Sequence, residues 1–401
     1  RLNSLHGMFA FGFVYLRSDT ILLARDADGI KPLYFAENDD YFIFSSEIQA
    51  IKQSGLLQTT INTSQLAHFF KYKHCRPDAT LFNEIKPLPP GHFLTFQLKN
   101  HTFQIKVIPP ELVTTKQQNN SGEGLDDVLK KAVQSHLKAN VRVGVMLSGG
   151  IDSSLLLHYA AAQQTDIPAY VVHTGAAPKQ ALLATQVFGG RYCPIEVSPE
   201  AFSHAFERWP MDLPVADSAA WLTYLLCKVA QKDTTVLLNG AGADEYFAGY
   251  RRHLAWYWYL KLRKLPFIPT LAKWAEGVFQ KRELQKIFAL LPLLPHEALG
   301  KISASGQGVF TLLRPELQAT NVDAYLSTAL SFKSVLHFDQ KHYLPGDVLH
   351  ITDQASMAQS VEVRLPFLDH TIRAMAEDFL PRQLINPYSI DQYGNPRLRK
   401  V

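Results

Sequence analysis

The sequence has few cysteines and lacks any long hydrophobic run. Its 401 residues include 3 cysteines, Cys75, Cys193 and Cys227. Their odd number and wide spacing provide neither a disulfide framework nor a CxxC metal pair, a pattern typical of a reducing cytoplasm. No apolar run reaches the ~18 residues needed to cross a bilayer, and no signal peptide is recognisable. We therefore expect a cytoplasmic protein with no membrane-spanning segment.

The chain also lacks a strong charge of either sign. Lysine and arginine number 40 and aspartate and glutamate 36, which leaves a formal net charge of +4. Because the basic residues form no long tract, binding to nucleic acid or to a membrane surface is not indicated. The composition, 47% hydrophobic and 19% charged, is that of a globular protein. The length exceeds that of one ordinary core, so we expect two domains.

The first part of the chain is predicted to form short strands separated by turns. Runs rich in Phe, Tyr, Ile and Val alternate with Asp-, Asn- and Gly-containing turn signals. This pattern predicts a mostly antiparallel sheet, with strands in 8–16, 21–25, 33–36 and 41–45. The chain opens on Arg1 with no initiator methionine, so we expect the first domain to be the tail of a longer one. A polar stretch around 116–124 predicts the domain boundary.

After this boundary, strands alternate with helices. A helical pattern from Leu125 is followed by the apolar strand 141–147 and the helix 151–163. Alternation of this kind predicts a parallel, doubly wound sheet. Further strands are predicted at 169–172, 192–197 and 235–238, and helices at 179–187, 200–208 and 219–232. Beyond Tyr250 the chain is mainly helical, and we place the two domains at 1–115 and 122–401.

The sharpest motif is the segment 147–154, Leu-Ser-Gly-Gly-Ile-Asp-Ser-Ser, between the first parallel strand and its helix. Ligands of open α/β sheets bind beyond the carboxyl ends of strands, where a helix N-terminus offers N–H groups to an anion. The glycines let the backbone approach phosphate and the serines add hydroxyl donors. Asp152 would repel phosphate unless a cation lay between them, so we infer a bridging Mg²⁺.

A capped turn is the simpler interpretation of this motif, because serine after Gly-Gly is common at a helix start. The succession of strand, SGGxDS loop and helix instead favours a pyrophosphatase-type nucleotide loop. It is not a Walker A loop, since no Gly-Lys-Ser/Thr follows.

The chain resembles the glutamine-hydrolysing asparagine synthetase family in several motifs that occur in the family's order. Residues 147–154 look like its ATP-binding PP-loop, 239–250 like its second motif and 361–369 like its C-terminal signature. Residues 7–11 and 25–34 resemble the last third of its glutaminase domain. The resemblance implies an α/β and α+β chain: the C-terminal part of an N-terminal-nucleophile (class II) amidotransferase sheet, then a Rossmann-like PP-loop synthetase domain with helical additions.

The resemblance also implies a set of site residues, which we carry over position by position. Asp152 and Asp244 would hold Mg²⁺ on pyrophosphate, which makes them the catalytic candidates. The remaining nucleotide-binding positions are Leu147 and Val172 beside the adenosine, Ser148, Gly149, Gly150 and Ser153 near the phosphates, and Asn239 and Gly240 along the site.

The implied reaction has two steps. The aspartate β-carboxylate attacks the α-phosphorus of ATP to give β-aspartyl-AMP, and ammonia, free or released from glutamine, then displaces AMP. Positioning and metal neutralisation of charge carry chemistry of this kind. ATP and Mg²⁺ are the implied cofactors, and the resemblance admits a homodimer. Because an ammonia tunnel joins the two sites in the family, we expect an apolar interface between the domains.

Three departures keep two alternatives open. No N-terminal cysteine nucleophile is present, so we expect no glutaminase centre. Ala241 occupies a position where many members carry a carboxylate, and Asn395, with Arg397 nearby, one where they carry lysine. The alternatives are another carboxylate-adenylating amide synthetase of the same fold, β-lactam-forming or peptide-modifying, and a catalytically silent nucleotide-binding relative.

Other charged motif residues also have a structural interpretation. Asp244 and Glu245 would suit a solvated helix start, where carboxylates favour the helix dipole. Glu362, Arg364 and Asp369 are as well explained by a buried ion pair that fixes their segment, so we leave them out of the predicted site.

Overall fold

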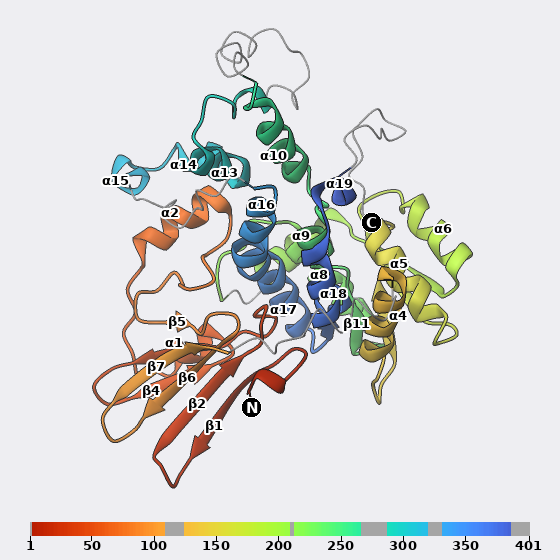
Figure 1. The fold of residues 1–401 in the computed structure, drawn as a ribbon. Helices are drawn as coiled ribbons and strands as arrows, with labels where there is room; N and C mark the ends of the chain where they lie inside the picture. Colours follow the sequence, from red (N-terminus) through yellow and green to blue (C-terminus); the bar gives the residue numbers. More distant parts are fainter. Residues whose placement is uncertain (1, 109–123, 209–211, 266–286, 320–330, 386–401) are drawn as a thin grey trace.

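The computed structural model describes residues 2–108, 124–208, 212–265, 287–319 and 331–385 (Figure 1). The predicted boundary between 115 and 122 lies outside these residues, as do Asn395 and Arg397. No helix among the described residues is both long and apolar enough to span a bilayer. All three cysteines are free thiols.

Two antiparallel sheets form the first part of the chain, which confirms the predicted antiparallel pairing, although the sequence predicts a single sheet of four strands. One sheet has the order β1-β2-β6-β7 and consists of β1 (Ala10–Tyr15), β2 (Thr20–Arg25), β6 (His92–Gln97) and β7 (Thr102–Val107). The other has the order β4-β3-β5 and consists of β3 (Tyr34–Glu37), β4 (Phe42–Ser45) and β5 (Lys86–Pro87). Leu23, Phe35 and Leu94 belong to one core cluster, which joins the two sheets. Two short helices, α1 (Ile48–Gln53) and α2 (Thr63–Tyr72), follow β4.

The second part is built on a five-stranded parallel sheet of order β10-β9-β8-β11-β12. Its strands are β8 (Val143–Met146), β9 (Pro168–His173), β10 (Arg191–Glu196), β11 (Val236–Leu238) and β12 (Glu362–Arg364). The chain runs outward from β8 through β9 to β10 and then returns to the other side of β8 for β11. This confirms the doubly wound class and places the reversal of strand order between β8 and β11.

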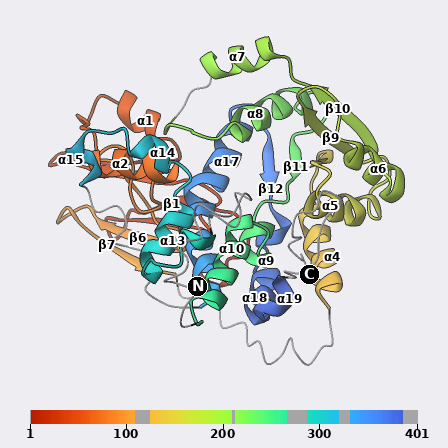
Figure 2. The ribbon, with the colours of Figure 1, turned by 90° about the horizontal axis from the view of Figure 1, so that it is seen from above.

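Helices cover both faces of the parallel sheet. Figure 2 shows α4 (Leu125–His136), α5 (Ile151–Ala161) and α6 (Lys179–Phe188) on one side, and α8 (Ala219–Ala230) and α17 (Leu349–Met357) on the other. Between them, β11 is buried along its whole length, as expected for strands enclosed on two faces. The other described helices of this part are α7 (Pro199–Arg208), α9 (Ala243–Phe247), α10 (Arg251–Leu262), α13 (Pro295–Ser303), α14 (Gln307–Phe310), α15 (Pro315–Gln318), α16 (Lys333–Phe338), the π-helix η2 (Asp339–Val348), the 3-10 helix η3 (Pro366–Leu368), α18 (His370–Asp378) and α19 (Pro381–Leu384).

Polar contacts connect the first part of the chain to the second. Lys31 Nζ lies 2.9 Å from Asp353 Oδ1 on α17. The Asp212 carboxylate accepts hydrogen bonds from the first backbone N–H groups of α1, those of Ile48 at 2.7 Å and Gln49 at 2.8 Å. Charged side chains therefore interrupt the predicted apolar interface at these places, while Ile30, Ala67 and Tyr72 of the first part belong to the same apolar core cluster as residues of the second.

Candidate active site

The predicted nucleotide loop leaves the carboxyl end of β8 and enters α5 directly. The Leu147 N–H donates to the Tyr170 carbonyl at 2.8 Å, which continues the pairing of β8 with β9. Gly149 has a φ of +82°, and a Cβ there would lie 2.8 Å from the Ala181 backbone nitrogen. Only glycine fits this turn, because both the backbone conformation and the neighbouring helix exclude a side chain. Gly150 is the N-cap of α5, so the helix N-terminus follows the turn at once.

The two serines of the loop lie in different environments. Ser153 is buried, and its hydroxyl accepts from the Ser148 N–H at 3.2 Å and donates to the Gly150 carbonyl at 3.2 Å. Ser148 is exposed, and its Oγ lies 3.0 Å from Ser153 Oγ. Ser153 therefore holds the shape of the loop, whereas Ser148 presents a hydroxyl at its outer surface.

The two positions predicted to contact adenosine, Leu147 and Val172, differ in exposure. The Leu147 side chain is only 2% exposed and packs in the core, so contact with a ligand would have to use its backbone. Val172 lies on β9 beyond Tyr170, which pairs with the last residue of β8, and it is partly exposed. Val172 thus stands at the carboxyl edge of the sheet, beside the loop that follows β8.

The second predicted loop follows β11 and lies against the first. Asn239 Nδ2 donates to the sulfur of Met146, at the end of β8, at 3.2 Å. Asn239 Oδ1 accepts from the Ala241 N–H at 2.8 Å. A Cβ at Gly240 would lie 3.1 Å from the Asp152 Cβ, so the backbone of this loop touches the base of the Asp152 side chain. Glycine at 240 makes this close approach between the two loops feasible.

Both loops therefore meet at the point where the strand order reverses. β8 and β11 are paired in parallel, with Val145 opposite Leu238, so their carboxyl ends share one edge. In open α/β sheets this crevice is the usual ligand position. The N-terminus of α5 adds backbone N–H groups and a positive dipole end suited to an anion.

Asp152 and Asp244 bring carboxylates to this edge from the first turns of α5 and α9. Both side chains are partly exposed. In the described part of the chain no cluster of three or more His, Cys, Asp or Glu side chains is arranged to hold a metal. Two carboxylates suit Mg²⁺, which usually takes one or two protein carboxylates and completes its shell with water and substrate phosphates. The residues present therefore fit a magnesium ion bound together with a phosphate ligand.

Glu245, next to Asp244, is buried rather than solvated. Its side chain is 1% exposed, and Oε1 accepts a hydrogen bond from the Tyr250 hydroxyl at 2.6 Å. Burial raises the pKa of Glu245 to about 7. The interpretation of this residue as part of a solvated helix start is thus wrong. The sequence does not predict the contact between Glu245 and Tyr250. α9 ends between these two residues, and the turn that follows it brings them together.

The C-terminal signature has structural roles in the described chain. Arg364 Nη1 donates to the carbonyls of His136 at 2.7 Å and Lys138 at 2.9 Å, and its Nε donates to Glu362 at 2.6 Å. This ties β12 to the C-terminal end of α4. Asp369 caps α18 by accepting from the Thr371 N–H at 2.9 Å. These contacts support leaving the three residues out of the site.

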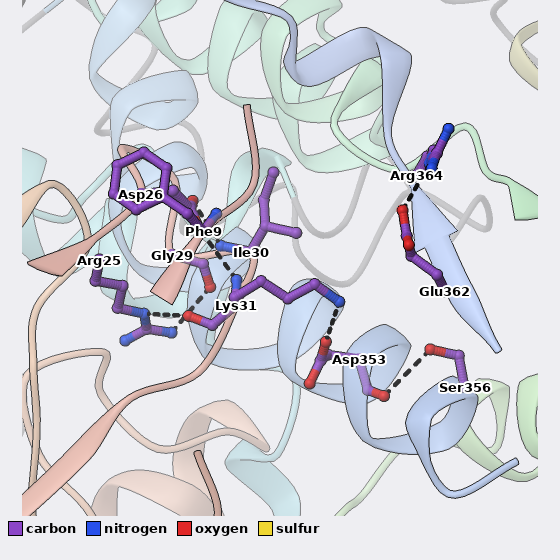
Figure 3. Close-up of polar contacts among 10 residues, drawn as sticks. All are labelled: Phe9, Arg25, Asp26, Gly29, Ile30, Lys31, Asp353, Ser356, Glu362 and Arg364. Carbon is purple, nitrogen blue, oxygen red and sulfur yellow. Dashed lines mark hydrogen bonds and ion pairs between the residues drawn. The ribbon is translucent and has the colours of Figure 1, made fainter. Parts of the chain in front are cut away.

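The first-domain motif 25–34 is likewise occupied by its own backbone (Figure 3). The Arg25 guanidinium donates to the carbonyls of Lys31 and Gly29 and to that of Leu88, at 2.8 to 2.9 Å. Asp26 accepts from the N–H groups of its own turn and of a neighbouring strand, namely those of Phe9, Asp28, Ile30 and Lys31. The motif therefore folds a turn, and from that turn Lys31 extends to Asp353 on α17.

Comparison with known proteins matches the chain to two family models. The model described as asparagine synthase covers residues 124–388, and the model described as a glutamine amidotransferase domain covers residues 1–106. The first match alone extends over more than half of the chain.

Individual relatives are similar over most of this chain. Asparagine synthetase (glutamine-hydrolyzing) 1 of Bacillus subtilis (strain 168) is 28% identical over 397 residues, which cover 92% of this chain and 61% of the relative. A Mycobacterium tuberculosis (strain ATCC 25618 / H37Rv) protein named for the same activity is 28% identical over 407 residues, 94% of this chain and 61% of the relative. The chain thus spans about three-fifths of the length of these relatives.

Proposed function

The chain belongs to the asparagine synthase family, and we propose that it is an ATP-dependent amide ligase that converts aspartate to asparagine. The proposed intermediate is β-aspartyl-AMP, and the nitrogen comes from glutamine or ammonia. The proposal also follows from the names of the similar proteins, which are asparagine synthetases.

One observation carries the proposal furthest. The two loops that the resemblance assigns to ATP follow strands that end at Met146 and Leu238, 92 residues apart in sequence, yet Gly240 lies against Asp152 where the strand order reverses. A shared edge between an anion-binding helix terminus and two carboxylates suits a ligand that carries both phosphate and metal. Magnesium pyrophosphate, as part of ATP, is such a ligand.

Each residue then has a defined task. The N–H groups at the start of α5 and the exposed Ser148 hydroxyl bind the phosphate oxygens, and Gly149 and Gly150 let the backbone approach them. Ser153 holds the loop in the shape that aims those donors. Asn239 keeps the second loop against the end of β8, and Val172 borders the adenosine.

Asp152 and Asp244 would hold the magnesium ion, whose chemistry is to neutralise the charge that develops on the departing pyrophosphate. Each carboxylate lies in the first turn of a helix, and the two helices follow adjacent strands. This fixes the two carboxylates relative to the loop that binds phosphate. Most of the rate enhancement in such a site comes from positioning the reacting groups and stabilising charge.

A second candidate within the same chemistry is a ligase that adenylates a different carboxylate and uses an amine of its substrate, peptide-modifying or β-lactam-forming. The methyl group of Ala241 cannot accept a proton from ammonia or from any other amine, so it does not choose between these ligases and instead favours the catalytically silent alternative. A substrate panel with aspartate and ammonia set against other carboxylate and amine pairs separates the two. If no carboxylate in the panel supports exchange of pyrophosphate into ATP, the catalytically silent alternative is favoured.

The test of adenylation is aspartate-dependent exchange of labelled pyrophosphate into ATP. We expect Asp152→Asn to lower the exchange rate by roughly 10²-fold or more, since it removes a preorganised charge from the site. Circular dichroism should remain that of the parent protein.

Asp127→Asn is the matched control, because Asp127 also occupies the first turn of a helix in the same part of the chain. It should exchange pyrophosphate at the parent rate. Equal rates in Asp152→Asn and the parent would remove Asp152 from the mechanism.

A further inference from the structure

The helix that carries Asp244 is too short to hold its own position. α9 has 5 residues, little more than one turn, and begins at Gly242 with φ +94° and ends at Ala248 with φ +60°. An isolated turn of helix is unstable in water, because nucleation costs more than one hydrogen bond returns. The placement of Asp244 must therefore come from contacts that α9 makes with the rest of the molecule.

Contacts hold α9 on several sides. On one side, Tyr250 donates to Glu245 at 2.6 Å, and Gln340 of η2 donates to the Glu245 carbonyl at 3.2 Å. Phe247 packs against Phe367 with ring centroids 6.5 Å apart. These contacts all lie within the second part of the chain.

The contact of Tyr246 reaches the first part of the chain instead. Its hydroxyl donates to Asp28 Oδ1 at 3.3 Å, and the same oxygen accepts from Arg373 Nη1 of α18 at 2.9 Å. Tyr246 is 8% exposed, and the Asp28 side chain is 9% exposed. The Arg373–Asp28 contact is a charge-assisted pair in a dry position, whereas the Tyr246 contact is longer than the usual O–H···O distance of about 2.5–3.0 Å and is the weaker of the two.

Asp28 is itself held rigidly. It lies in the turn that the Asp26 carboxylate folds, and its own N–H donates to Asp26 at 3.2 Å. The Asp28 carboxylate therefore joins a well-braced turn of the first domain to α9 and α18. The distance along the chain from Asp28 to Arg373 is 345 residues, so the network exists only when both parts are docked.

We propose that Asp28 is a positioning residue for the second site loop: by holding Tyr246 and Arg373 it fixes α9, and so sets where Asp244 presents its carboxylate. The first domain thus supports metal and pyrophosphate binding without contributing a ligand of its own. This inference rests on the proposed function, in which Asp244 is a magnesium ligand.

The chain offers a matched control for this network. Lys31–Asp353 and Arg373–Asp28 are both ion pairs between the same two parts, both 2.9 Å long and similarly buried, with exposed fractions of 24% and 11% against 25% and 9%. Lys31–Asp353 ends on α17, whereas the Asp28 carboxylate of the other pair also accepts from Tyr246 of α9. Loss of docking alone would weaken the site in either variant, whereas loss of positioning would follow only from the Asp28 network.

The first measurement needs no ligand. Hydrogen exchange of the backbone amides in 239–250 should be faster than in the parent in Asp28→Ala and in Tyr246→Phe, and unchanged in Lys31→Met. Tyr246→Phe removes only the hydroxyl and leaves the ion pair intact, so it remains informative if Asp28→Ala fails to fold.

The second measurement is calorimetric binding of magnesium pyrophosphate. We expect the dissociation constant to rise by about tenfold in Asp28→Ala, the size expected for a lost hydrogen bond to a charged group, and by about threefold in Tyr246→Phe, whose contact is longer. The double variant should be no weaker than Asp28→Ala alone, because the two residues act through one contact. Lys31→Met should bind within about twofold of the parent, as distant sites usually do.

The two measurements separate the inference from the function on which it rests. No binding by the parent protein would overturn the proposed function, and the exchange experiment would still show whether Asp28 holds α9. Exchange in 239–250 that is the same in the parent and in both variants would overturn the inference, whatever the parent binds. Equal losses in Lys31→Met and Asp28→Ala would overturn it too, since docking alone would then explain both.

Discussion

Two glycine-containing turns, 25–31 in the first domain and 147–153 in the second, both carry family motifs. They differ in how far the polar side chains of the motif are bonded to the protein itself. In the first, Arg25 donates to three carbonyls and Asp26 accepts from four N–H groups, all of them backbone. In the second, Ser153 is buried in contacts of the loop, while Ser148, which also accepts from the Gly150 N–H at 3.3 Å, stays exposed beside a helix N-terminus. Motif residues alone do not distinguish a structural turn from a ligand-binding loop; the exposure of their polar groups does.

The largest effect should come from breaking the internally satisfied turn. Asp26 is 1% exposed, and Asp26→Ala would leave four N–H groups without their acceptor. The Ile30 contact is buried and the other three are partly buried. A buried donor left unpaired costs about 1–3 kcal/mol and one that water can reach costs less, so we expect a loss of about 3 kcal/mol or more in unfolding free energy. That is a large fraction of the stability of many domains.

Urea denaturation followed by circular dichroism measures this loss. Asp40→Ala, at an exposed turn of the same domain, is the control and should change the unfolding free energy by less than about 0.5 kcal/mol. If Asp26→Ala is as stable as that control, water must bind the N–H groups that the carboxylate leaves, and the turn would then be more accessible to solvent than the burial of Asp26 indicates.

The next effect concerns a position in the ligand-facing region. Ala241 is partly exposed at the edge of the core, and only its backbone N–H is bound to Asn239 Oδ1, so a longer side chain there leaves this loop contact in place. A positioned carboxylate that accepts a proton from ammonia is typically worth ~10² to 10⁴ in rate. We expect Ala241→Glu to speed asparagine formation by at least about 10²-fold and to leave pyrophosphate exchange unchanged.

The test measures both activities in the parent and the variant. Glu245 cannot take over the role in the present conformation, because its side chain is buried and bound to Tyr250. Brisk amide formation by the parent, lowered by Ala241→Glu, would show that the base lies elsewhere.

The sequence predicts most of the parallel sheet, because its strands are apolar runs with turn signals at both ends. β12 was missed. It has 3 residues, and only Val363 is buried while Glu362 and Arg364 are not, so no apolar run marks it. Its strand conformation comes from pairing with β11, a partner far away in sequence.

The site shows the same division between local and long-range information. The motif at residues 147–154 predicts a loop between a strand and a helix, and the structure has that loop at the predicted place. The contact of Gly240 with Asp152 depends on strand order, which the local pattern does not contain. The burial of Glu245 and the reach of Asp28 to Tyr246 depend on docking, which no single segment encodes.

The smallest expected effect sharpens the comparison within one loop. Ser153→Ala removes a buried hydroxyl that serves the Ser148 N–H and the Gly150 carbonyl, and should cost about 1–2 kcal/mol in unfolding free energy. Ser148→Ala removes an exposed hydroxyl and should cost less than about 0.5 kcal/mol.

Binding of magnesium pyrophosphate should depend on the exposed hydroxyl instead. Ser148→Ala should weaken this binding by roughly fivefold, about the net value of one hydrogen bond, while the unfolding free energy stays almost unchanged. Denaturation and calorimetry on the two variants give both quantities. If Ser148→Ala destabilises the fold as much as Ser153→Ala and leaves the affinity unchanged, the loop is as closed as the turn around Asp26, and Ser148 has no part in binding phosphate.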